Sequence, residues 1–301
     1  MSRFVYLDNN ATTRVAPEVR DAMLPFFDAL WGNPSSMHQF GGRVMRHVAE
    51  ARGKLAALIH ADPSEIIFTS CGTESDNAAI YGAAEILGPR ARIITSRVEH
   101  PAVLGPCRHF REHGYTVVEL PVDSVGQIDL GALREALYGG NCLVSLMWAN
   151  NETGTVFPID EVAALVKSVG GVFHTDAVQA VGKLPIDVRT TPVDLLSLSG
   201  HKIHAPKGIG ALYVRRGTRL QTFMIGGHQE NGRRGGTENV PYIVGLGRAA
   251  ELAAAGMAEE QTRVAALRDR LEAGLLATCP DARVNGDTHH RLPNTLNISF
   301  Q

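Results

Sequence analysis

Short apolar runs alternate along the chain with segments in which apolar residues recur at helical spacing. The runs predict strands over residues 66–69, 92–95, 115–120, 143–148, 172–175, 195–198 and 209–214. Helices are predicted after Glu74, from about 101 to 113, after Asp129, and from 158 to about 169. Strands separated by helices indicate an α/β fold with a mostly parallel sheet and helices on both faces. The strands are almost entirely apolar, as expected where both faces of a sheet are covered.

The pattern changes after about Asn239. A long segment rich in Ala, Leu, Arg and Glu runs to about Thr278 and keeps its apolar residues at helical spacing, which predicts a long helix. Residues 282–284 and 295–300 then have the composition of two further strands.

This change predicts two domains. Residues 1–250 are expected to form a large domain, and residues 251–301 the start of a small, incomplete α+β domain. Residues 1–20 are expected to pack with the small domain. The sequence stops at Gln301 inside a predicted strand, so we expect the natural protein to continue.

Composition narrows the possible functions. Of the 301 residues, 44% are apolar and 20% are charged, with 29 basic and 31 acidic side chains. This balance gives no basis for binding nucleic acid or an anionic membrane. No apolar run approaches the ~18 residues of a membrane span, and the first residues lack the apolar core of a signal peptide. Four scattered cysteines without a C-x-x-C pair favour a reduced, cytoplasmic setting and argue against a structural zinc site.

Polar residues follow several predicted strands, and ligands of open α/β sheets bind beyond the carboxyl ends of the strands. Gly72 and Thr73 open a helix, where main-chain N–H groups and a hydroxyl could hold a phosphate. The same segment could be an ordinary helix cap. His100 follows another strand and could lie against a cofactor ring, or simply begin a helix.

Three more strand ends carry polar side chains. Asn151 could donate to a carboxylate or a phenolate, or belong to an Asn/Gly turn. Asp176 could face a ring nitrogen, with Gln179 reaching the same ligand, or it could cap a helix. Lys202 stands among small residues after a strand, although most lysines are solvated surface charges. The Gly-rich loop 226–237 contains two arginines and suits either an anion or a subunit contact.

Together these sites fit one ligand, pyridoxal 5'-phosphate (PLP). PLP enzymes need a lysine that holds the cofactor as a Schiff base, a carboxylate at the pyridine nitrogen, and donors for the phosphate. Lys202, Asp176 and the pair Gly72–Thr73 can fill the three roles. The G-x-G-x-x-G and GK[ST] fingerprints of dinucleotide and nucleotide sites are absent from the sequence.

Taken in order, these motifs resemble those of a known family along essentially the whole chain. The segments that carry the resemblance include YLDNNATT (6–13), GNPSS (32–36), HTDAVQ (174–179) and SGHK (199–202), together with residues 69–75, 98–100, 149–155 and 233–239. They are similar to the cysteine desulfurases of the class V aminotransferase group, and most of all to the nitrogen-fixation (NifS-like) type.

The resemblance implies the fold type I architecture of PLP enzymes and a homodimer. It implies that Lys202 holds PLP and acts as a base at the substrate Cα, while Asp176 pairs with the pyridine nitrogen. Gln179 would bond the ring phenolate oxygen. His100 would stack on the ring and help to transfer protons.

Contacts to the phosphate and the substrate are also implied. Thr73, Ser199 and His201 would hold the phosphate of the same subunit. Thr237, in the Gly-rich loop, would reach the phosphate bound in the other subunit. Asn151 would touch both the cofactor and the substrate carboxylate.

The implied reaction converts L-cysteine to L-alanine and passes the sulfur on as a protein persulfide, with an iron–sulfur scaffold protein as acceptor. Nitrogenase cluster assembly is the favoured destination, and general iron–sulfur assembly is the alternative. Metal binding is a further attribute implied by the family, although no residue here is assigned to a metal. Two other functions stay open: a selenocysteine lyase or other class V PLP enzyme, and a fragment that binds PLP without turnover.

One part of the family's machinery has no counterpart in this sequence. The cysteine that takes the sulfur, and an arginine that binds the substrate carboxylate, would lie beyond Gln301. We therefore expect this chain alone to hold PLP and to turn over cysteine poorly. Cys71 begins a helix beside the expected phosphate site, at the wrong end of the cofactor to take the sulfur. Cys107, Cys142 and Cys279 are interpreted as core residues.

Overall fold

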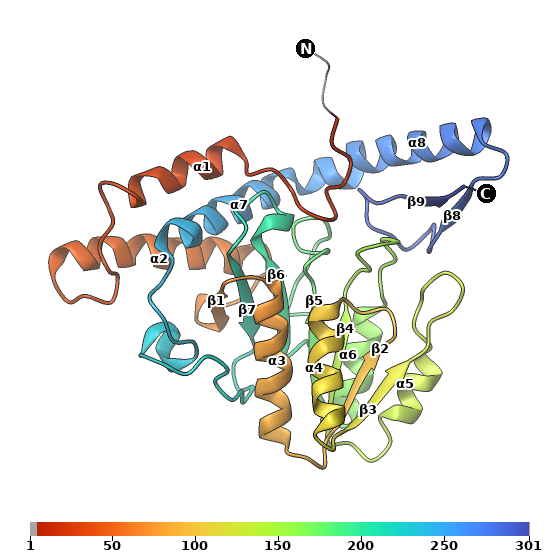
Figure 1. Ribbon diagram of the computed structural model, residues 1–301, viewed down its shortest axis with the longest axis horizontal. Helices are drawn as coiled ribbons and strands as arrows, with labels where there is room; N and C mark the ends of the chain where they lie inside the picture. Colours follow the sequence, from red (N-terminus) through yellow and green to blue (C-terminus); the bar gives the residue numbers. More distant parts are fainter. Residues whose placement is uncertain (1–4, 301) are drawn as a thin grey trace.

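A seven-stranded sheet occupies the centre of the computed structural model, which describes residues 5–300 (Figure 1). The strands are β1 (Ile66–Thr69), β2 (Arg92–Ser96), β3 (Thr116–Leu120), β4 (Cys142–Met147), β5 (Val172–Asp176), β6 (Leu195–Ser199) and β7 (Gly210–Val214). Their order is β1-β7-β6-β5-β4-β2-β3. Strand β7 runs antiparallel to β1 and β6, and the other neighbouring pairs are parallel. The prediction of a mostly parallel sheet is confirmed.

Eight α-helices surround the sheet or extend from it in the described residues. They are α1 (Pro17–Met23), α2 (Gln39–Leu58), α3 (Gly72–Leu87), α4 (Pro101–Glu112), α5 (Leu130–Ala136), α6 (Ile159–Ser168), α7 (Val240–Glu259) and α8 (Ala265–Thr278). Short 3-10 turns cover Leu24–Phe26, Pro63–Glu65, Gly200–Lys202 and Gln229–Gly232, and a π-helical segment covers Glu260–Val264. A separate hairpin pairs β8 (Arg283–Asn285) with β9 (Asn297–Ser299).

The sequence did not predict α1 and α2. Helix α1 has only seven residues, too few to show a helical period. Helix α2 contains Gly41, Gly42 and Gly53, which lower helix propensity. It is helical because Val44, Val48 and other apolar residues on one side are fully buried, so packing overrides propensity.

Alternate strand residues face two separate cores, as the two-residue period of a strand requires. Ile67, Ile93, Leu143 and Leu195 pack with the buried side chains of α3 and α4. These two helices lie side by side on one face of the sheet (Figure 1). Ile66, Ile94, Val144, Phe173 and Leu196 join the core that α1, α2, α6 and α7 cover on the other face.

Helix α7 packs closely against α2 and then continues through the π-helical segment into α8 (Figure 1). Helix α8 buries none of its side chains. Cys279 follows α8 and is partly exposed, so its interpretation as a core residue was wrong, whereas Cys107 and Cys142 are buried as predicted. The domain boundary expected near residue 250 falls inside α7 and stays a prediction. Among the described helices, none is both long and apolar enough to cross a membrane.

The contact between α2 and α7 depends on Gly247. A Cβ atom at this position would lie 2.6 Å from both the Cα and the Cβ of Ala51. Real carbon atoms do not approach this closely, so the two helix backbones can meet only where a side chain is absent.

Gly247→Ala should therefore destabilise the fold by about 1–3 kcal/mol, because one of the two helices must shift to accept the methyl group. Gly256→Ala is the matched control: it lies in the same helix, and an added Cβ meets nothing within 4 Å. We expect this second change to be neutral, or stabilising by up to about 1 kcal/mol through helix propensity. Urea denaturation measures both, and equal effects would contradict the close approach.

Candidate active site

The predicted site residues gather beyond the carboxyl ends of the central strands. Strand β5 ends at Asp176, which is in register with Met147 of β4 and Ser197 of β6. Lys202 closes the 3-10 turn that follows β6 directly. The parallel arrangement thus brings segments that are far apart in sequence to one edge of the sheet.

Asp176 supplies a buried carboxylate with 7% of its surface exposed. Burial raises its pKa, while the N–H of Val178, which donates at 2.9 Å, and the charges of His100 and Lys202 act to lower it. Burial is the larger effect. A cation placed against this carboxylate would stabilise the charged form, which is the interaction that a protonated pyridine nitrogen offers.

Lys202 is not a solvated surface charge. Its Nζ donates to the main-chain oxygen of Asn10 and, at 2.9 Å, to that of Ala11. Burial lowers the pKa of Lys202, while the negative charges of Asp176, Asp8 and Glu152 act in the opposite direction.

An N-terminal strap, residues 8–16, crosses this edge of the sheet and is held mainly through Asn10. The side-chain nitrogen of Asn10 donates to the main-chain oxygen of Asn151 at 3.2 Å and to Thr295 Oγ1 at 2.9 Å. Its main-chain oxygen accepts from Gln179 Nε2 at 2.9 Å as well as from Lys202. In the sequence, Asn10 stands in the motif YLDNNATT without a role of its own, because nothing local shows that one asparagine joins four separate segments.

The strap also fixes His201. The main-chain N–H and the hydroxyl of Thr13 donate to the oxygen of His201 at 3.0 and 2.9 Å, and Thr12 Oγ1 lies 3.0 Å from His201 Nδ1. Burial and the neighbouring positive charge of Lys202 lower the pKa of His201 to about 4. The imidazole is therefore neutral at physiological pH and can act as a hydrogen-bond donor.

The start of α3 lies against Ser199. A Cβ on Gly72 would be 3.3 Å from the Cβ of Ser199 and 2.8 Å from Cγ2 of Val178, so glycine is needed at this contact. Cys71 at the N-cap position makes no side-chain cap, and Thr73 is exposed. A helix N-terminus without a capping side chain favours a phosphate site over an ordinary cap.

The other predicted residues vary in how closely they join this group. His100 caps α4 by accepting from the N–H of Ala102 at 3.1 Å, and it also acts electrostatically on Asp176. Asn151 is half-buried in the turn after β4. Thr237 is exposed and lines a hollow of about 160 Å³ beside Ser70, and within this chain no described contact joins it to Lys202.

Sequence comparison and this geometry lead to the same family. The sequence profile described as aminotransferase class-V matches residues 5–301. The chain belongs to the class-V aminotransferase family. A cysteine desulfurase from Nostoc is 58% identical over 297 residues, and the cysteine desulfurase NifS of Azotobacter vinelandii is 56% identical over 298 residues. Each comparison covers 99% of this chain and 74% of the relative.

Solved structures agree with the class-V assignment. A structure titled NifS-like protein matches with a TM-score of 0.95 and 41% identity, over 99% of this chain and 82% of the other. A structure titled SspA in complex with cysteine matches with a TM-score of 0.89 and 36% identity, over 99% of this chain and 84% of the other.

PLP is the cofactor of class-V enzymes and of this chain. The residues present fit it: a buried carboxylate for the ring nitrogen, a helix start in contact with Ser199 for the phosphate, and a lysine directed into the site. In residues 5–300, no group of three or more His, Cys, Asp or Glu side chains is arranged to hold a metal ion.

Two buried acids near Asp176, Glu99 and Asp76, were given no role in the sequence-based prediction. Glu99 is 5% exposed, and its Oε1 accepts from Ser96 Oγ at 2.6 Å and from the N–H of Met147 at 3.1 Å. Burial raises the pKa of Glu99 to about 8 and holds that of Asp76 well above its ordinary value. Both shifts favour the protonated acids, so less negative charge competes with Asp176 for the neighbouring positive charges.

Asp76 is paired with a neutral histidine. Its Oδ1 lies 3.6 Å from His174 Nε2, and burial lowers the pKa of His174 to about 3. His174 also contacts the hydroxyls of Ser145 and Ser197, at 2.8 and 2.9 Å. The position of Asp76 among the buried residues of α3 is the signal that could have identified it, because an acid on an apolar helix face requires a partner.

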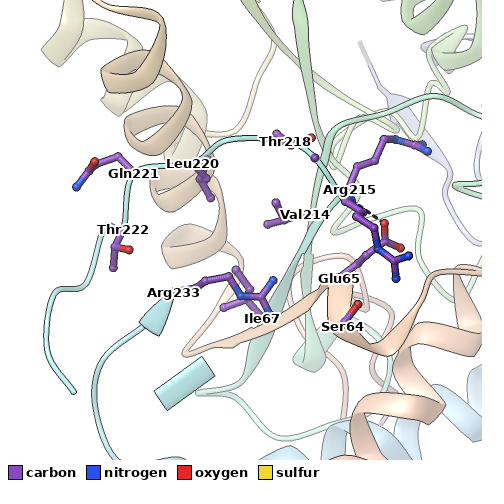
Figure 2. Close-up of a pocket in the computed structure, with 12 residues that line it drawn as sticks. Ser64, Glu65, Ile67, Val214, Arg215, Thr218, Leu220, Gln221, Thr222 and Arg233 are labelled. Atoms are coloured by element: carbon purple, nitrogen blue, oxygen red, sulfur yellow. Dashed lines mark hydrogen bonds between the residues drawn. The ribbon is translucent and has the colours of Figure 1, made fainter. Parts of the chain in front are cut away.

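A hollow of about 230 Å³ lies at the opposite edge of the sheet (Figure 2). Strand β7 begins beside Ser199 and ends at Val214, which lines this hollow, so the hollow is remote from Lys202. The guanidinium of Arg215 in its wall already donates to the oxygen of Val193 at 2.7 Å. This hollow is therefore not a candidate for the PLP site, which lies around Lys202 and Asp176.

Glu99→Gln tests the buried neutral acid. The folded pKa of about 8 exceeds the ordinary value of 4.5, so the native protein keeps a proton that the unfolded chain loses. Stability from this group is present at low pH and is lost as the pH rises through 8. Glutamine has no such dependence, so the stability of the variant relative to wild type should rise by about 3 kcal/mol between about pH 5.5 and pH 8.5. Unfolding titrations at both pH values check this, and a constant difference would contradict it.

Proposed function

We propose that this class-V protein is a PLP-dependent cysteine desulfurase, which takes sulfur from L-cysteine to give L-alanine and a protein persulfide. The placement of Lys202 supports this function best: its amine is bonded to the strap and lies within electrostatic reach of the buried Asp176. The names of the relatives, two of which are cysteine desulfurases, support the substrate.

The proton chemistry follows from two side chains. Bound PLP supplies an electron sink for the electron pair left when a proton departs from the substrate Cα. Asp176 would keep the pyridine nitrogen protonated, because its negative carboxylate stabilises the positive charge of the protonated ring. Lys202 holds the cofactor and then moves the Cα proton, and its lowered pKa favours the neutral amine that can accept one.

The remaining residues bind and orient. Gly72, Thr73, Ser199 and His201 hold the phosphate at the start of α3, where the helix dipole favours an anion. His100 would lie against the cofactor ring and assist proton transfer.

Gln179 donates to the phenolate oxygen of the ring, and Asn151 contacts both the cofactor and the substrate carboxylate. We further propose a homodimer in which the exposed Thr237 reaches the phosphate bound by the second copy. The sulfur is passed to an iron–sulfur scaffold protein in the cytoplasm, with nitrogenase clusters as the favoured destination.

Lys202→Ala is expected to abolish the near-visible absorption of lysine-bound PLP, because no other described lysine has its amine at this position. Lys207→Ala, an exposed lysine five residues further on, serves as the control and should keep the band. Adding L-cysteine should change the spectrum of the wild-type chain and leave that of the Lys202 variant unchanged, whereas alanine release from residues 1–301 alone is expected to be slow. An unchanged band in Lys202→Ala would refute the assignment. A response to selenocysteine but not to cysteine would favour a selenocysteine lyase.

A further inference from the structure

Lys183 is a buried lysine that the proposed chemistry does not use. It lies in the turns after β5, and only 7% of its surface is exposed. Its Nζ donates to the main-chain oxygen of Gln179 at 3.0 Å and to the side-chain oxygen Oε1 of the same residue at 3.1 Å. Burying an ammonium group is unfavourable, so the position of Lys183 requires an explanation, and its two hydrogen bonds to Gln179 indicate one.

The first consequence concerns the orientation of the Gln179 amide. A side-chain amide can be rotated so that its oxygen and nitrogen exchange places. Lysine can only donate hydrogen bonds, so the oxygen must face Lys183 and the nitrogen must face away. The nitrogen then donates to the main-chain oxygen of Asn10 at 2.9 Å.

The second consequence concerns location. The same Asn10 oxygen accepts a hydrogen bond from Lys202. Two N–H donors that share one acceptor must lie close together, so the Gln179 nitrogen is delivered beside the amine that holds PLP. Lys183 is thus connected to the cofactor site through a single side chain.

The π-helical segment that follows α7 (Glu260–Val264) packs behind Lys183. Gln261 Nε2 donates to the main-chain oxygen of Lys183. The negative charge of Glu260 stabilises the ammonium group, and its buried Oε2 has no hydrogen-bond partner among the described residues. Burial and the charge of Lys202 lower the pKa of Lys183 to about 8. Single π turns within α-helices are frequent at functional positions.

We propose that Lys183 is a positioning residue of the cofactor site, which locks the Gln179 amide with its nitrogen toward PLP. Because this role rests on the proposed function, it is tested first without cofactor. In the cofactor-free protein, the Gln179 side-chain NH₂ should give distinct, protected NMR signals that Lys183→Met removes and Lys207→Met leaves in place. Unchanged signals in Lys183→Met would overturn the proposal, whether or not the protein binds PLP.

The second measurement is the affinity for PLP, followed by fluorescence. Lys183→Met should weaken binding about three- to tenfold, the effect of one misdirected hydrogen bond. Lys207→Met, which removes an exposed charge that also acts on His201, should stay within about twofold of wild type. A wild-type protein that binds no PLP would refute the proposed function and leave the NMR result standing.

Coupling separates positioning from a general structural effect. In a Gln179→Met background, Lys183→Met should have no further effect on PLP affinity, because the side chain through which it acts is gone. Additive losses would overturn the proposal. Gln179→Glu provides a second route if Lys183→Met does not fold: it keeps the acceptor for Lys183 but has no N–H to donate. Wild-type affinity in Gln179→Glu would also overturn the proposal.

Discussion

A carboxylate buried at the end of the central strand is the constraint around which the site is built. An isolated anion in such a place is unfavourable by several kcal/mol, so Asp176 needs compensation from its surroundings. The structure provides an N–H from Val178 and the charges of His100 and Lys202. Burial also raises the pKa of the nearby acids Glu99 and Asp76, which weakens the competition from a second negative charge. The site is thus prepared for a cation before any cofactor arrives.

Much of the fold could be predicted because its strands are buried on both faces and form uninterrupted apolar runs. The direction of β7 could not, because an apolar run looks the same in parallel and antiparallel pairing. Helix α2 could not be predicted because its glycines lower the helix propensity of the segment, and tertiary packing supplies the stability. Local pattern therefore identified buried strands well and failed where packing decides.

The same distinction applies to the site. Lys202 and Asp176 could be located because each stands at or just beyond the end of a strand, and strand ends converge. Asn10, Glu99 and Lys183 have no such local signal, since their importance comes from partners far away in the sequence. Lys183 in particular reads as an ordinary charge until its two bonds to Gln179 are seen. Supporting residues of this kind become visible only when the chain is folded.

The contacts of the strap at Asn10 also form in a definite order while the chain is synthesised. Its main-chain oxygen joins Gln179 and Lys202, and its side chain bonds Thr295, 285 positions further along the chain. On a ribosome, the sheet and the strap's bonds to Gln179, His201 and Lys202 can form from residues that emerge well before Thr295, so the bond to Thr295 is made last. The nascent strap is therefore attached to the strand ends first, and its link to the loop before β9 follows later in synthesis.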